Sequence, residues 1–158
     1  MSGSKPTLIL VPGYWEGTKV FDHVASLLSS RGYPVSYAPL ISTGTVSPGN
    51  PSLHDDVKAI RAVLEPIVEE GKEVILVLHS AGGFLGSNAT ENLSFKLREK
   101  CGKKGGISKI VFLAAAVFPE GHMHGDLPIF VKKVSKESSL FTGVAHPNFD
   151  KKRAGYVP

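Results

Sequence analysis

The feature that most constrains the fold is a change of pattern inside residues 74–83. The first five of these residues, 74–78, are continuously apolar, which is typical of a strand buried on both faces of a sheet. His79 and Ser80 interrupt the apolar run, and a glycine pair then opens a helical pattern. The segment therefore predicts a strand that turns sharply into a helix and presents a serine side chain at the turn.

Apolar runs alternate with helical periods along most of the chain. Strands are predicted at residues 7–11, 34–38, 73–78 and 107–118, and the helices between them at residues 18–30, 52–70 and 81–100. This order predicts an α/β fold, a three-layer sandwich whose short, mostly parallel sheet of about four strands is covered by helices on both faces. The periodicity fades after Pro119, so residues 119–158 are expected to form an irregular tail.

Local signals refine the helical segments. Ser52 with Asp55 three residues later predicts a capping box at the start of the second helix, and Gly71 is expected to end that helix. Pro66 lies inside the pattern and should kink the helix or end it early. The third helix is expected to break near Asn92.

Composition and charge exclude several functional classes. The chain is 42% hydrophobic and 20% charged, as in ordinary globular proteins, and its net charge of +4 comes without the aromatic-interleaved basic face of a nucleic-acid binder. The apolar run at residues 7–11 is too short for a signal peptide or a membrane span, so a cytoplasmic location without membrane contact is expected. The single cysteine, Cys101, excludes an internal disulfide, and the Cys and His spacings of a structural zinc site are absent. The glycine-rich turns lack the sequence motifs of nucleotide-binding loops. We therefore expect no metal and no cofactor.

Ser80 is the candidate catalytic nucleophile. A serine hydroxyl needs a base, an orienting acid and donors that stabilise the oxyanion. The backbone N–H of Ala81 is one candidate donor, because it lies at the start of a helix. The second is the N–H of Tyr14 in the loop after the first strand, where Gly13 allows the backbone to approach closely. His79 is expected to be a packing residue.

These segments resemble the α/β-hydrolase superfamily, in particular its small methylesterase and hydroxynitrile-lyase branch and fungal relatives. The resemblance covers residues 5–120 and is carried by residues 11–15, 55–61 and 78–83. It implies that Ser80 is the nucleophile, on a turn supported by the small residues Gly13, Gly82 and Gly83. Leu78 stands where the general pattern has glycine, which predicts that the turn is shifted.

In this family the acid and the histidine follow the nucleophile on loops after two further strands, and no strand pattern follows residue 118. The resemblance therefore implies a truncated core over residues 1–118 and a partial cap or irregular tail over residues 119–158. Asp126 and His146 keep the family's chain order, although neither follows a predicted strand that would fix it in place.

Two functions remain open at this point. One is a serine hydrolase of the esterase type that acts on small esters, and the other is a catalytically incomplete homologue that binds a ligand or another protein. The fourth strand, residues 107–117, is interior in the family's strand order and would here be an exposed, uncharged edge. Such an edge predicts self-association through strand pairing.

Overall fold

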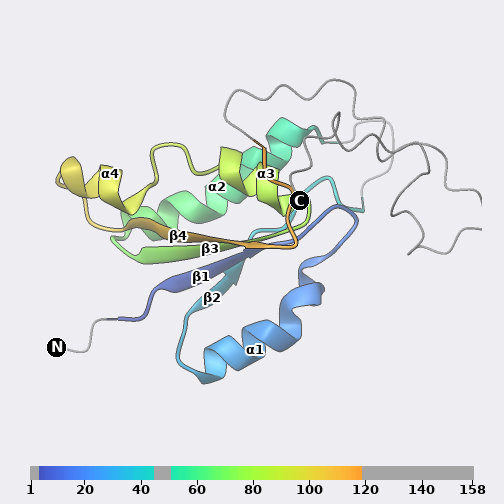
Figure 1. Cartoon of the computed structure of the whole chain (residues 1–158), viewed down its shortest axis with the longest axis horizontal. Coiled ribbons are helices and arrows are strands. Elements are labelled where there is room, and N and C mark those ends of the chain that lie inside the picture. The colour runs from blue at the N-terminus through green and yellow to red at the C-terminus, as the bar shows by residue number, and fades with distance from the viewer. Residues whose placement is uncertain (1–3, 45–50, 119–158) are drawn as a thin grey trace, which may run out of the picture. The chain divides into compact units, whose positions relative to one another are not determined.

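The computed structural model describes residues 4–44 and 51–118. Its four strands, β1 (Thr7–Val11), β2 (Val35–Tyr37), β3 (Glu73–His79) and β4 (Gly106–Leu113), form one parallel sheet in the order β2-β1-β3-β4 (Figure 1). The predicted α/β fold is confirmed. The chain divides after Ala116 into two units, and the description below concerns the first.

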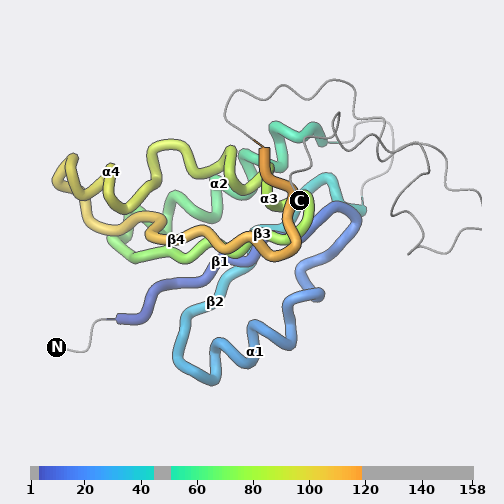
Figure 2. The backbone as a smooth tube through the Cα atoms, viewed as in Figure 1, coloured from blue at the N-terminus to red at the C-terminus, as the bar shows by residue number. Residues whose placement is uncertain are grey.

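Helices cover both faces of this sheet. The helical segments are η1 (Thr18–Phe21), α1 (Asp22–Ser30), α2 (Leu53–Glu69), α3 (Gly82–Asn88) and α4 (Phe95–Lys100). Helix α1 lies against one face, and α2, α3 and α4 lie on the other, so that the chain builds the three expected layers (Figures 1 and 2). The described residues contain no helix that is both long and apolar enough to cross a membrane.

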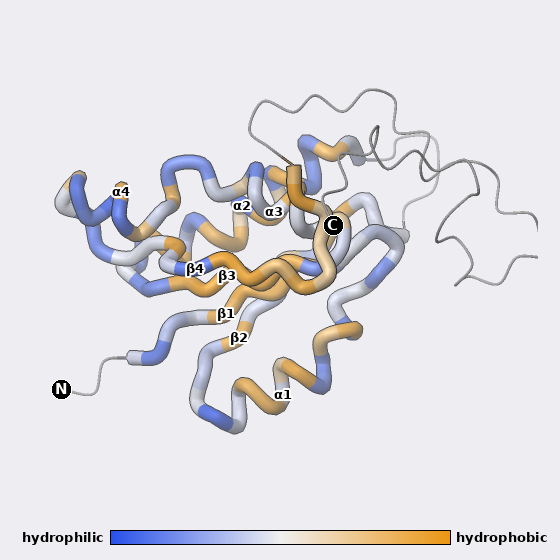
Figure 3. Tube along the Cα trace, in the orientation of Figure 1, coloured by the Kyte–Doolittle hydropathy of each residue, from blue (hydrophilic) through white to orange (hydrophobic). Residues whose placement is uncertain are grey.

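The alternation along β3 shows how the two faces are filled. Val74, Leu76 and Leu78 are fully buried. Ile75 and Val77 point to the opposite face, because successive side chains of a strand alternate, and pack there against a second core. The buried members of that core are Leu8, Leu10, Phe21 and Ala25, from β1, η1 and α1. The apolar residues of the central strands therefore meet a helix on each side (Figure 3).

Helix α2 has the predicted capping box. The Ser52 hydroxyl accepts the Asp55 N–H at 3.3 Å, and the Asp55 carboxylate accepts the Ser52 N–H at 2.9 Å. The Ser52 hydroxyl, which donates to Asp55 Oδ2 at 2.7 Å, and the Ser52 N–H lower the pKa of Asp55. Of the two outcomes expected for Pro66, an early end of the helix is wrong, since α2 continues to Glu69, and a kink stays a prediction. Pro66 lies in the last turn, where a proline disrupts few of the remaining intrahelical hydrogen bonds.

The third predicted helix is broken, as expected. Helix α3 ends at Asn88 and α4 begins at Phe95, with Asn92 between them at φ 61°. Strand β4 is shorter than predicted and ends at Leu113. The reason is the left-handed backbone of Ala114 at φ 45°, after which the N–H of Ala116 donates to a carbonyl beyond the end of β3.

Strand β4 is an edge of the sheet in the part that the structure describes. It pairs with β3 alone among the described strands, and Val111, Phe112 and Leu113 are 39–50% exposed. The tube of β4 carries apolar colouring in Figure 3. The exposed edge agrees with the sequence, while self-association through it stays a prediction.

Candidate active site

Ser80 lies between the end of β3 and the start of α3, at the carboxyl edge of the parallel sheet. Its φ is 51°, in the left-handed region that costs a residue with a side chain about 1–2 kcal/mol. The Ser80 carbonyl accepts hydrogen bonds from the N–H groups of Gly83 and Ala116, at 3.0 and 2.9 Å. These two bonds hold the strained residue in place.

Two glycines after Ser80 are required by close backbone contacts. A Cβ on Gly82 would lie 2.7 Å from the Pro12 carbonyl oxygen, and a Cβ on Gly83 would overlap the carbonyl oxygen of Ala116. Real Cβ atoms do not approach other atoms this closely. The first turn of α3 can therefore lie directly against the loop after β1.

Helix α3 leaves room for the Leu78 side chain. Its side chain is fully buried, and a Cβ added to Gly86 of α3 would overlap Leu78 Cδ2 and lie 3.2 Å from Cδ1. A shift of the turn at Leu78 stays a prediction. A smaller residue at position 78 would leave room between the strand and the helix. Here Gly86 of α3, which has no side chain, leaves that room instead.

The β1–η1 loop, residues 12–17, brings a second backbone segment to Ser80. A Cβ on Gly13 would lie 2.6 Å from Ser80 Cβ and 2.9 Å from Ser80 Oγ, so only glycine fits there. The Gly13 N–H donates to Glu16 Oε2 at 3.0 Å, and the Glu16 N–H donates back to the Gly13 carbonyl at 3.4 Å. Trp15 closes this turn with φ 62° and is 72% exposed.

The Tyr14 side chain is anchored between the loop and the helices. Its ring meets Phe84 edge-on at a centroid distance of 6.0 Å. Partial burial, together with the nearby carboxylate of Asp56, raises the pKa of Tyr14 to about 12. Asp56 is fully buried and accepts the Ser42 N–H at 2.9 Å and the Ser42 hydroxyl at 2.6 Å.

His79 does more than fill space. Its Nδ1 lies 2.9 Å from the Leu113 carbonyl oxygen, its Nε2 lies 3.4 Å from Glu16 Oε2, and its ring meets Phe21 edge-on. Sequence reasoning missed Glu16. The available signal was a carboxylate inside the loop that was expected to supply an oxyanion donor.

Two of the predicted site residues, Asp126 and His146, lie outside the described residues. The structure brings the others together: Gly13, Tyr14, Ser80, Ala81, Gly82 and Gly83. Within residues 4–44 and 51–118, no hydrogen bond involves the Ser80 hydroxyl, and no cluster of side chains could hold a metal ion. One surface hollow, of about 410 Å³, has Glu73 in its lining, lies at the opposite end of β3 and does not belong to this site.

Comparison with known proteins places these features in context. The model of the alpha/beta hydrolase family matches residues 8–157. The chain is 31% identical over 117 residues to the alpha/beta hydrolase nvfD of Aspergillus novofumigatus, which covers 74% of this chain and 46% of that protein. It is 27% identical over 124 residues to a probable hydrolase of a Phoma species, covering 78% of this chain and 48% of the relative.

Solved structures share the fold. An extracellular α/β-hydrolase from a Paenibacillus species, described as a structural and functional homologue of tobacco salicylic acid binding protein 2, superimposes with a TM-score of 0.54 at 22% identity. The match covers 73% of this chain and 47% of that one. Tomato methylketone synthase I, complexed with 2-tridecanone, gives a TM-score of 0.56 at 22% identity and covers 73% and 42%. The chain spans about half the length of the relatives it matches.

Proposed function

The chain belongs to the alpha/beta hydrolase family, and from that premise we propose that it is a serine hydrolase that cleaves small carboxylic esters. Ser80 is the nucleophile, and the N–H groups of Tyr14 and Ala81 stabilise the oxyanion. The observation that carries the proposal is the φ of 51° at Ser80. Strain of this kind at a residue with a side chain is concentrated at functional sites.

The proposed reaction is an acyl transfer. Ser80 Oγ attacks the ester carbonyl carbon and loses its proton to a base, the carbonyl oxygen becomes an oxyanion, and the alcohol leaves with a proton. Water then attacks the acyl-enzyme, which releases the carboxylic acid and restores Ser80. Asp126 and His146 are the candidates for acid and base that keep the family's chain order.

The hydrogen bonds around the loop support Tyr14 as the oxyanion donor. The Gly13 N–H donates to Glu16 Oε2, and Tyr14 is the next residue of the loop that Gly13 brings against Ser80. Ala81 follows Ser80 directly, and within the described segments no backbone hydrogen bond involves its N–H. Two amides on either side of a nucleophile are the usual composition of an oxyanion hole.

A fluorophosphonate probe tests this proposal, because it forms a covalent bond only with an activated serine. We expect labelling of the wild-type chain and loss of labelling in Ser80→Ala. Ser30→Ala is the matched control, since Ser30 ends α1 and its exposed hydroxyl donates only to the Leu27 carbonyl. Labelling that persists in Ser80→Ala would contradict the assignment of the nucleophile.

A catalytically incomplete homologue that binds a ligand or another protein is the second candidate. The observation that favours it is that His79, the histidine next to Ser80, has both ring nitrogens engaged, by Leu113 and Glu16. It therefore offers no unengaged nitrogen to the Ser80 hydroxyl. Folded wild-type protein that resists the probe would support this candidate over the first.

A further inference from the structure

The chain reaches Ser80 a second time immediately after β4. Ala114 has a left-handed φ of 45°, and two residues later the Ala116 N–H donates to the Ser80 carbonyl at 2.9 Å. The same segment lies against the first turn of α3, where a Cβ on Gly83 would overlap the Ala116 carbonyl oxygen. Figure 2 shows the chain after β4, in orange, beside α3. We call residues 114–116 the Ala114 turn.

The hydrogen bond from Ala116 also determines where the next N–H group points. The Ser80 carbonyl and the Ala81 N–H belong to one planar peptide unit, so they point in opposite directions. Two donors hold this carbonyl, the Gly83 N–H within α3 and the Ala116 N–H from the chain after β4. Fixing the carbonyl therefore fixes the direction of the Ala81 N–H. Because linked hydrogen bonds polarise one another, the bonds to the carbonyl also make this N–H a stronger donor.

This contact depends on the conformation of Ala114. Strand β4 ends at Leu113, whose carbonyl oxygen lies 2.9 Å from His79 Nδ1. The left-handed φ of the next residue turns the chain out of the strand direction, so that Ala116 comes back to Ser80. The side chain of Ala114 is exposed, so packing does not explain this unfavourable conformation. Such conformations persist where the surrounding structure requires them, and they are concentrated at functional sites.

We propose that the Ala114 turn is a positioning element of the oxyanion site, which holds the Ser80 carbonyl so that the Ala81 N–H faces the substrate oxygen. The inference rests on the proposed function, because the Ala81 N–H stabilises an oxyanion only if Ser80 attacks a carbonyl. The turn itself is not catalytic, since Ala116 contacts the backbone of Ser80 and not the substrate.

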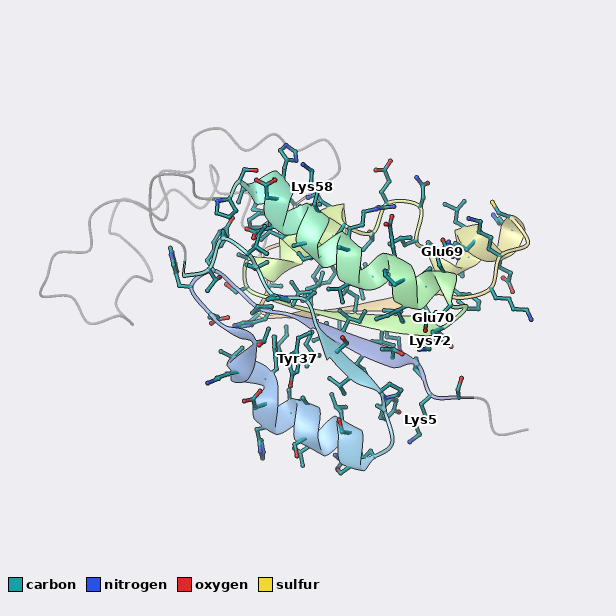
Figure 4. All side chains as sticks on the ribbon, turned by 180° about the vertical axis from the view of Figure 1, so that it is seen from behind. Lys5, Tyr37, Lys58, Glu69, Glu70 and Lys72 are labelled. Atoms are coloured by element: carbon teal, nitrogen blue, oxygen red, sulfur yellow. The ribbon has the colours of Figure 1, made fainter. Side chains whose placement is uncertain are left out.

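Substitutions at Ala114 separate the role of the backbone from that of the side chain. Because the side chain is exposed, there is room for both valine and asparagine. Asparagine adopts the left-handed conformation far more readily than the β-branched valine. We therefore expect Ala114→Asn to keep the hydrogen bond to Ser80 and Ala114→Val to lose it. Ala62→Val is the matched control, because Ala62 is exposed on α2, four residues after Lys58 (Figure 4).

The fluorophosphonate probe measures the consequence, because its phosphoryl oxygen takes the place of the oxyanion. The rate constant of the covalent step depends on the oxyanion donors, whereas the preceding reversible binding depends on them much less. Loss of a whole donor costs about 10²–10³ in rate, so a misdirected Ala81 N–H in Ala114→Val should slow the covalent step by about tenfold or more. Reversible binding should stay within about twofold of the wild type, and Ala114→Asn and Ala62→Val should react as the wild type does. Equal rates in Ala114→Val and Ala114→Asn, or a loss confined to reversible binding, would overturn the positioning role.

A second variant and a measurement without activity complete the test. Ala116→Pro removes the donor directly, and it should slow the covalent step as Ala114→Val does. In isotope-labelled protein, the nitrogen resonance of the Ala81 amide should move in both of these variants and stay in place in Ala114→Asn. A resonance that does not move in folded Ala114→Val and Ala116→Pro shows that the turn does not hold this peptide, which overturns the inference alone. A folded wild-type protein that is never labelled overturns the serine chemistry and, with it, the role of the turn in the oxyanion site.

Discussion

The contact between Leu78 and Gly86 predicts that the effect of Gly86→Ala on the free energy of unfolding changes sign when Leu78 is replaced by alanine. Leu78 is fully buried at the end of β3, and Gly86 of α3 lies so close that an added Cβ would overlap Leu78 Cδ2. Because Leu78 is enclosed, its side chain cannot simply rotate away. The perturbation is Gly86→Ala, made first in the wild-type background and then in Leu78→Ala.

The magnitude follows from two opposing terms. Overpacking a filled core costs about 1–3 kcal/mol, whereas alanine is favoured over glycine inside a helix by about 1 kcal/mol. Gly86→Ala should therefore lower the free energy of unfolding of the wild type by about 0–2 kcal/mol. Leu78→Ala alone should cost about 2–5 kcal/mol through the cavity it leaves. In that background only the helix term remains, so Gly86→Ala should stabilise the chain by about 1 kcal/mol.

Urea unfolding of the four proteins measures these terms, provided that the m-values agree. The cycle should give a coupling of about 1–3 kcal/mol between the two positions. Gly17→Ala is the control, because a Cβ at Gly17 meets no atom within 4 Å and its φ of −83° suits any residue. If Gly86→Ala changes the stability equally in both backgrounds, to within about 0.5 kcal/mol, the explanation of how Leu78 is accommodated is wrong.

Three further predictions concern other parts of the chain. Arg98 is 5% exposed and donates to the carbonyls of residues 68, 104 and 105, so Arg98→Met should lower the free energy of unfolding by about 2–4 kcal/mol in urea titrations. Glu69→Gln should lower it much less, because Glu69, the ion-pair partner of Arg98, is exposed. Tyr14 should ionise near pH 12 rather than near pH 10. The measurement is the phenolate absorbance after a rapid pH jump, taken as the difference between the wild type and Tyr14→Phe. Since the folded pKa is the higher one, the stability that the neutral phenol contributes should be complete below pH 10 and lost as the pH rises towards 12. Val111→Lys on the edge strand β4 should reduce concentration-dependent self-association in sedimentation experiments, and Val20→Lys, at an exposed valine of η1, should not.

The sequence predicts the elements of this fold because their signals are local. Strand and helix periods, the capping box at Ser52 and the break near Asn92 each depend on residues a few positions apart, and each is found in the structure. The end of β4 was missed for the opposite reason. Alanine carries no signal for the left-handed conformation that Ala114 adopts, so the apolar run looked like five more residues of strand.

The candidate site depends on contacts between segments that are distant in sequence, and these separate what was predicted from what was not. Parallel strands bring their carboxyl ends to one edge, so the sequence could indicate that the loop after β1 meets Ser80. It could not indicate that Glu16 turns back to the Gly13 amide, because that depends on Trp15 adopting a φ of 62°.

The same limit applies to Leu78, and it changes how the family pattern is interpreted. A glycine before the nucleophile is one way to keep strand and helix close, and a glycine on the facing turn of the helix is another. The physical requirement is for space between two backbones, and either side can supply it. A motif that specifies one position therefore describes one solution to that requirement. The departure at Leu78 is consequently no argument against Ser80, because Gly86 meets the same requirement from α3, and the backbone at Ser80 keeps its left-handed φ.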